Sequence, residues 1–195
     1  MSSKVFPSGG RRRMRERLMH PNSLTLFRIA ASPAVVLLML APGRLSSFMA
    51  AMIFSAAAIT DYLDGYYART RGLVTTFGKV MDPMADKLLV CTAFIMLTAQ
   101  GWTPAWIVCI IVAREIAVTA LRGIMAEHGK DVSASGLGKY KTGFQIAAII
   151  PLLMHTPYFG IDMQTIGAFF LWGAVIFTVW SGIDYFIRFR KLLDA

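Results

Sequence analysis

The chain has 195 residues, of which 56% are hydrophobic and 16% are charged. This composition excludes an ordinary soluble enzyme and is typical of an integral membrane protein, while the length fits one domain. The formal net charge is +9. Because Lys and Arg near a bilayer attract anionic lipids, we expect anionic membrane lipid as a partner and no nucleic acid.

Residues 1–20 form a basic segment ahead of the first apolar run, with six Lys and Arg residues against one acidic residue. Two interpretations stay open. The segment is either a solvated positive anchor or a short amphipathic helix lying on the membrane, with Met14, Leu18 and Met19 inserted. No short apolar core and small-residue cleavage site follows it, so we predict no signal peptide. We expect residues 21–195 to form one membrane domain.

Six apolar segments follow, each close to the roughly 20 residues that a helix needs to cross a bilayer. The predicted spans are Leu24–Ala41, Leu45–Thr70, Asp82–Gln100, Pro104–Glu127, Gly138–His155 and Thr165–Arg188. Asp82 is predicted to cap the third span, with Pro83 in its first turn. The sequence therefore predicts an all-α integral membrane fold with six transmembrane helices.

Basic residues lie mainly on one side of these spans. They occur near both termini and in the second and fourth connections, whereas the other three connections together hold only Arg44. Positive charge in loops marks the cytoplasmic side of a membrane protein. Both termini and the end of the second span are therefore expected to face the cytoplasm.

Four of the 11 acidic residues fall within 26 residues, at the end of the second span and the start of the third: Asp61, Asp64, Asp82 and Asp86. Spacings of three and four place each pair on one helix face. An ionisable group at membrane depth costs about 2.5–3.5 kcal/mol, so such groups are functional candidates. Hard divalent cations such as Mg²⁺ prefer carboxylate oxygens together with substrate phosphates. Two such ions about 4 Å apart would suit a phosphoryl displacement.

The carboxylates have two other interpretations. The aspartates could pair with Arg69, Arg71 and Lys79 at cytoplasmic helix ends, but this explains four like charges poorly. They could also line an ion pathway in a transporter, which would spread acidic residues through the bundle instead of gathering them at one face. The concentration at one face favours metal-assisted chemistry.

The pattern Asp-x2-Asp-Gly-x2-Ala-Arg-x8-Gly-x3-Asp-x3-Asp resembles the signature of the CDP-alcohol phosphotransferases. All eight fixed positions are present: Asp61, Asp64, Gly65, Ala68, Arg69, Gly78, Asp82 and Asp86. The resemblance implies a six-helix membrane enzyme, usually a homodimer, that moves a CDP-linked phosphoryl-lipid group onto an alcohol and releases CMP. It implies two Mg²⁺ ions on the four aspartates, with Mn²⁺ as a substitute and Asp86 as general base. It further places Asp64, Gly65, Ala68, Arg69 and Gly78 at the nucleotide-linked lipid.

Outer motifs are similar to the branch of this family that makes phosphatidylglycerophosphate in bacteria. They comprise residues 21–28, 113–116, 120–122, 125–127 and 138–142. The similarity implies CDP-diacylglycerol and glycerol 3-phosphate as substrates, in a multi-pass protein of the bacterial inner membrane with a cytoplasmic active site. Asn22, Thr25 and Arg28 would contact CDP-diacylglycerol. Alternatively, Asn22 or Ser23 merely caps the first span, and Arg28 snorkels to the membrane interface.

The acceptor site is predicted from basic residues of the fourth and fifth spans. Arg114 lies roughly ten residues into an apolar helix, where an arginine should face a polar cavity or a partner. A guanidinium fork suits a phosphate, so we expect Arg114, Arg122, Lys139 and Lys141 to bind glycerol 3-phosphate, and Glu115 to orient a neighbouring base. These cations could instead be ordinary positive-inside charges. Other readings are a different acceptor such as inositol phosphate, a carboxylate-lined cation transporter, or a non-catalytic lipid-binding scaffold.

Overall fold

The computed structural model describes the backbone of residues 21–71, 76–127, 136–158 and 160–193, and the side chains of residues 25–60, 84–125, 138–158 and 160–190. These residues form six helices and no strand, apart from one isolated bridge between Tyr158 and Ile161. The helices are α2 (Pro21–Leu40), α3 (Arg44–Arg71), α4 (Thr76–Ala99), α5 (Ala105–Glu127), α6 (Gly136–Met154) and α7 (Met163–Leu193). The predicted all-α class is confirmed. The predicted N-terminal surface helix lies outside the described residues.

Helix bounds follow the predicted spans closely, with one exception at the start of α4. That helix begins at Thr76, so Asp82 lies inside it and the predicted cap with Pro83 in the first turn was wrong. Inside a helix, proline removes one backbone hydrogen bond and its ring crowds the carbonyl four residues earlier. Membrane helices tolerate this because neighbouring groups satisfy the freed carbonyl, so Pro83 does not mark the start of α4. Helix α2 begins at Pro21, which places Asn22 and Ser23 in its first turn rather than ahead of it.

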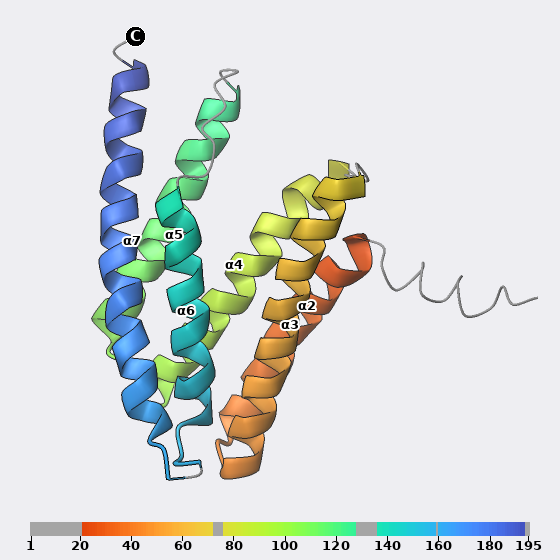
Figure 1. Cartoon of the computed structure of the whole chain (residues 1–195), viewed down its shortest axis with the longest axis vertical. Coiled ribbons are helices and arrows are strands. Elements are labelled where there is room, and N and C mark those ends of the chain that lie inside the picture. The colour runs from red at the N-terminus through yellow and green to blue at the C-terminus, as the bar shows by residue number, and fades with distance from the viewer. Residues whose placement is uncertain (1–20, 72–75, 128–135, 159, 194–195) are drawn as a thin grey trace, which may run out of the picture.

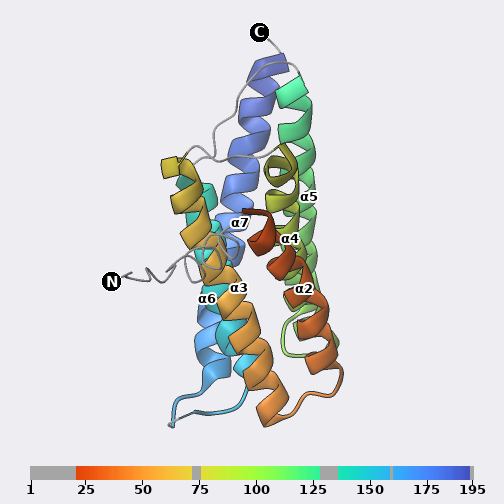
Figure 2. The ribbon, with the colours of Figure 1, turned by 90° about the vertical axis from the view of Figure 1, so that its right-hand side faces the viewer.

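Consecutive helices run up and down along the long axis of the molecule (Figures 1 and 2). The connections α2–α3, α4–α5 and α6–α7 lie at one end, while α3, α5 and α7 all finish toward the other end. Helix α4 contacts α2, α3, α5 and α6, and α7 packs on α5 and α6. The helix that carries Asp82 and Asp86 therefore lies at the centre of the bundle.

Apolar side chains from α2 to α7 form one buried cluster, in which Phe54, Phe94 and Leu152 are completely inaccessible. Small residues let α6 and α7 approach closely. A Cβ atom added to Gly167 would lie 2.5 Å from Leu152 Cγ, and one added to Gly173 would lie 2.5 Å from Phe144 Cδ1. Close packing of helix backbones at small residues is the usual way in which membrane helices associate.

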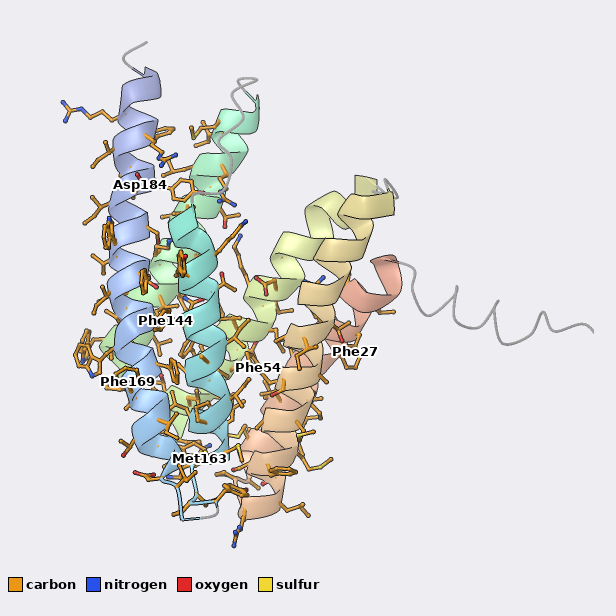
Figure 3. All side chains as sticks on the ribbon, in the orientation of Figure 1. Phe27, Phe54, Phe144, Met163, Phe169 and Asp184 are labelled. Atoms are coloured by element: carbon orange, nitrogen blue, oxygen red, sulfur yellow. The ribbon has the colours of Figure 1, made fainter. Side chains whose placement is uncertain are left out.

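The outer surface of α7 is strongly apolar. Phe169 is 72% exposed and Trp172 is 54% exposed, and Phe169 points away from the bundle (Figure 3). Within the described part of the chain, one helix segment, Met163–Arg190, is long and apolar enough by itself to cross a membrane, with a mean hydropathy of 1.8. Shorter apolar stretches occur in α2 and α3. An exposed apolar surface of this kind fits contact with lipid.

The end of the molecule with the short connections has its own polar contacts. Asp162 caps α7: its Oδ1 accepts a hydrogen bond from Gln164 N at 3.0 Å, and its Oδ2 accepts one from Thr165 Oγ1 at 2.5 Å. The Thr165 hydroxyl and the backbone amides hold the pKa of Asp162 below its ordinary value. Nearby, the guanidinium of Arg44 lies 5.3 Å from the ring centroid of Tyr158, whose hydroxyl donates to the Arg44 carbonyl at 3.4 Å.

Candidate functional site

The four aspartates occupy facing parts of a helical hairpin. Asp61 lies ten residues before the end of α3, and Asp86 lies ten residues after the start of α4, which is about 15 Å from the helix end in both cases at 1.5 Å per residue. Asp64 and Asp82 match in the same way, at about 10 Å. Because only residues 72–75 join these antiparallel helices, the sequence places all four residues at corresponding depths. The side chains of Asp61, Asp64 and Asp82 lie outside the described ones.

Asp86 has a described side chain, and it is partly buried on α4. Its charge interacts with those of Lys87 on the same helix and Lys141 on α6. Among the described side chains, no three acidic, histidine or cysteine groups gather as a metal site would require. Three of the predicted ligands fall outside that set, so the metal site stays a prediction that rests on the donor chemistry of four carboxylates.

Beside Asp86 lies a buried cluster of charges from α5 and α6. Glu115 is 6% exposed and Lys141 is 4% exposed, and Lys141 Nζ donates a hydrogen bond to Glu115 Oε1. Arg114 Nη1 lies 3.6 Å from the same oxygen. Buried charges are costly unless they are paired. The Glu115 carboxylate thus compensates part of the positive charge of Lys141 and Arg114. Lys87 adds a further positive charge nearby.

Helix α7 adds an aromatic residue that the sequence interpretation did not include. Tyr185 is only 2% exposed, and its hydroxyl accepts a hydrogen bond from Arg122 Nη2. The Cζ atoms of Arg122 and Arg114 lie 4.9 Å and 5.6 Å from the centroid of its ring. No local sequence signal links Tyr185 to a residue 63 positions earlier. Only the packing of α5 on α7 brings them together.

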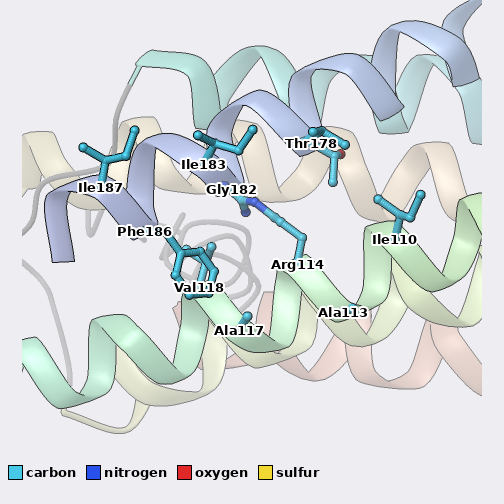
Figure 4. A pocket seen from close by; sticks show the side chains of 11 residues that line it. Ile110, Ala113, Arg114, Ala117, Val118, Thr178, Gly182, Ile183, Phe186 and Ile187 are labelled. Carbon is cyan, nitrogen blue, oxygen red and sulfur yellow. The ribbon is translucent and has the colours of Figure 1, made fainter. Parts of the chain in front are cut away.

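Arg114 reaches from α5 toward α7 at Gly182 (Figure 4). It lies at a groove of about 440 Å³ whose other lining residues, including Ile110, Val118 and Ile183, are mostly apolar. A Cβ atom on Gly182 would lie 3.4 Å from Arg114 Cγ, which is close to van der Waals contact, so the arginine stem passes next to the α7 backbone at this glycine. The buried Nε of Arg114 has no hydrogen-bond partner in the described structure.

The structure separates Lys139 from the other three predicted acceptor residues. Lys141 is buried against Glu115, whereas Lys139 is exposed and lines a second groove of about 540 Å³ with Tyr140, Phe144 and other residues. Two residues along a helix differ by about 200° in direction at 3.6 residues per turn. The two lysines therefore cannot face the same side of α6.

Residues predicted to contact the nucleotide-linked lipid are described only in part. Thr25 and Arg28 on α2 are 1% and 3% exposed. Arg28 therefore points into the protein and does not snorkel to the surface. The side chains of the remaining predicted contacts lie outside the described ones: Asn22, Asp64, Gly65, Ala68, Arg69 and Gly78.

Comparison with known proteins shows the family to which the chain belongs. The family model described as CDP-alcohol phosphatidyltransferase matches residues 18–180. The CDP-diacylglycerol–glycerol-3-phosphate 3-phosphatidyltransferase of Bacillus subtilis (strain 168) is 46% identical over 180 residues, covering 86% of this chain and 93% of the relative. The protein with the same name from Escherichia coli (strain K12) is 40% identical over 179 residues, covering 89% and 97%. The chain belongs to the CDP-alcohol phosphatidyltransferase family, and the predicted resemblance is confirmed.

Proposed function

We propose that the protein transfers the phosphatidyl group of CDP-diacylglycerol to glycerol 3-phosphate, giving phosphatidylglycerophosphate and CMP. It is a transferase of phospholipid biosynthesis. Two relatives that share this activity in their names match nearly the whole chain, and the eight signature positions are all present. The structural observation that supports an anionic acceptor is the cluster of Arg114, Arg122 and Lys141, in which Lys141 is buried, Arg122 is exposed, and the charge of Lys141 interacts with that of Asp86.

A divalent metal fits the donor set, because carboxylates are the hard oxygen ligands that such ions prefer. We assign two Mg²⁺ ions, replaceable by Mn²⁺, to Asp61, Asp64, Asp82 and Asp86. When bound, the metal neutralises the diphosphate and stabilises the charge that develops on the departing CMP. Asn22, Thr25, Arg28, Gly65, Ala68, Arg69 and Gly78 are assigned to CDP-diacylglycerol.

The remaining steps belong to side chains of the chain itself. Asp86 accepts the proton of the glycerol 3-phosphate 1-hydroxyl, whose oxygen attacks the lipid-side phosphorus while CMP leaves. Arg114, Arg122 and Lys141 bind the acceptor phosphate through charge-assisted hydrogen bonds. Glu115 holds Lys141 and lowers the local excess of positive charge. Lys139, which faces outward, is assigned to attraction of the anionic membrane surface instead of the acceptor.

We further propose that all six helices span the bacterial inner membrane, with both termini and the active site on the cytoplasmic side. The alternating directions of the helices support this topology (Figure 1). The C-terminal end of α7 carries exposed Arg188 and Arg190, whereas Arg44 lies at the opposite end of the bundle. Residues 1–20 would lie at the cytoplasmic surface on anionic lipid, and the enzyme would act as a homodimer.

One experiment tests the assignment against its alternatives. Purified protein is incubated with CDP-diacylglycerol, Mg²⁺ and, in turn, glycerol 3-phosphate or inositol phosphate, and CMP and lipid products are identified by mass spectrometry. We expect CMP and phosphatidylglycerophosphate with glycerol 3-phosphate only. Turnover with inositol phosphate would overturn the assignment of glycerol 3-phosphate as the acceptor. Ion flux without CMP release would indicate a transporter, and lipid binding without turnover would indicate a scaffold.

A further inference from the structure

Two like-charged guanidinium groups converge on one side of α5. Arg114 and Arg122 are eight residues apart, which is about 12 Å along the helix axis, yet both Cζ atoms lie within 6 Å of the Tyr185 ring centroid. Each arginine has a long flexible stem that loses rotamer entropy when its head group is fixed. The groups also repel each other. Something must therefore hold both head groups in this arrangement.

Tyr185 has the chemistry for that task. The face of an aromatic ring carries partial negative charge and attracts cations within about 6 Å, and a buried ring on α7 is a fixed platform for both groups. The phenol oxygen accepts one N–H of Arg122, and a guanidinium has five such donors. The remaining donors stay available for an oxyanion.

A tyrosine at this point also differs from an acidic residue in one essential way. A carboxylate would hold the arginines more strongly, but it would cancel their charge and compete with a phosphate for the same donors. A neutral ring orients the two cations without itself cancelling their charge, although Glu115 offsets part of the charge of Arg114. Glu115 shows the contrast, because its carboxylate accepts a hydrogen bond from Lys141 and offsets part of the charge of Arg114.

Gly182 lies three residues before Tyr185 and therefore shares its side of α7. A Cβ atom added to Gly182 would lie 3.4 Å from Arg114 Cγ. The close view shows Arg114 directed at this point (Figure 4). Helix α7 thus contacts Arg114 at two points, with its backbone near Gly182 and with the ring of Tyr185. Both features come from a helix that carries none of the aspartate signature.

We propose that Tyr185 is a positioning residue of the acceptor site, which holds Arg114 and Arg122 so that their free N–H groups meet the phosphate of an anionic alcohol. The proposal rests on the proposed function, since it takes these arginines as phosphate ligands. Tyr185 itself touches neither substrate. Its effect on the reaction passes entirely through the two guanidinium groups.

Tyr185→Phe and Tyr185→Leu separate the hydroxyl from the ring. The phenylalanine variant loses one hydrogen bond, so the KM for glycerol 3-phosphate should rise about threefold to tenfold. The leucine variant also loses both ring contacts and should raise that KM about tenfold to a hundredfold. The KM for CDP-diacylglycerol should stay unchanged, and kcat should change less than the acceptor KM. Steady-state kinetics with each substrate varied in turn measures all three quantities.

Tyr158→Phe is the matched control. Tyr158 also has an arginine on its ring and a hydrogen-bonded hydroxyl, but its partner is Arg44, which lies at the opposite end of the bundle from the C-terminus. We expect wild-type kinetics from this variant. A similar rise in the acceptor KM there would overturn the proposal, because a general loss of packing would then explain both results.

Two further outcomes would also overturn the proposed role of Tyr185. One is an unchanged acceptor KM in Tyr185→Phe and Tyr185→Leu, and the other is an equal rise in KM for both substrates. If only the leucine variant fails to fold, as judged by thermal melting in detergent, the phenylalanine variant still decides. A wild-type protein that releases no CMP with glycerol 3-phosphate would refute the proposed function itself. That result is distinct from a failure of the role of Tyr185, which appears only in an active enzyme.

Discussion

At the scale of single residues, the site combines groups that act by charge with groups that act by position. Asp86 lies next to Lys87 and within electrostatic reach of Lys141. A general base acts in its carboxylate form. The same cations attract an anionic substrate toward the base. The proposed base and the proposed phosphate ligands are thus parts of one electrostatic unit.

Asp86→Asn should nearly abolish turnover and leave CDP-diacylglycerol binding partly intact. The amide keeps the shape of the side chain but removes the base and one negative charge. Single-turnover CMP release and equilibrium binding of CDP-diacylglycerol measure the two effects. Asp184→Asn is the control and should keep normal turnover, because Asp184 pairs with Arg188 on α7 and has no assigned part in the site. Near-normal activity of Asp86→Asn would exclude Asp86 as the base.

Lys141→Gln and Lys139→Gln form a matched pair on one helix. Lys141 is buried against Glu115 and Lys139 is exposed. Loss of the Lys141 charge should raise the KM for glycerol 3-phosphate about tenfold to a hundredfold, because a charge-assisted contact is worth about 1.5–3 kcal/mol. It should also lower the Tm, since Glu115 loses its hydrogen-bonded partner. Lys139→Gln should change neither quantity.

Kinetics with both substrates and melting curves in detergent compare the two lysine variants. Equal effects of the two substitutions would mean that the lysines act alike, as ordinary positive charges at the membrane surface. A lower Tm of Lys141→Gln with an unchanged acceptor KM would reduce Lys141 to a structural ion pair.

At the scale of helices, local pattern predicted where elements lie but not how they face each other. Apolar run length and Pro-Gly breaks were sufficient for six helices, because both signals are local. The directions of Lys139 and Lys141 depend on how α6 is rotated where it packs on α3, α4 and α7. The partnership of Tyr185 with Arg122 depends on the packing of α7. A single sequence contains no local signal for either contact.

Gly167→Ala should destabilise the contact between α6 and α7. Its new Cβ would meet Leu152 Cγ at 2.5 Å and the Leu152 backbone nitrogen at 3.1 Å, so the helices must separate. Overpacking of this kind costs about 1–3 kcal/mol. Gly143→Ala, on α6 with nothing within 4 Å of its new Cβ, should leave the Tm unchanged or raise it slightly. Thermal melting of both variants in the same detergent checks this, and equal Tm values would contradict the close-packing argument.

At the scale of the whole molecule, the fold brings distant segments to one depth. Helices α3 and α4 contribute the aspartates at matching distances from their shared connection, while α5, α6 and α7 contribute the charge cluster and Tyr185. The spacing of the aspartates predicts metal chemistry because it encodes the helix face, and that site stays a prediction. The sequence could not predict which basic residues of the acceptor site converge, since long-range packing decides this.

Removal of metal tests both the activity and the stability that we expect from the four aspartates. With excess chelator the four aspartates lose their counter-ions and repel one another, so CMP release should stop. Mg²⁺ or Mn²⁺ should restore it, and Ca²⁺ should restore it poorly because its coordination is larger and looser.

The metal should also affect the stability of the protein. An ion that binds only the folded state stabilises that state by about 2.7 kcal/mol when the ion is at 100 times its Kd. The Tm should therefore fall with chelator and recover with Mg²⁺ even when no substrate is present. This Mg²⁺-dependent rise in Tm should be lost in Asp61→Asn and kept in Asp184→Asn. Full activity in excess chelator, or an equal Mg²⁺ response in Asp61→Asn, would refute the assignment of metal to the four aspartates.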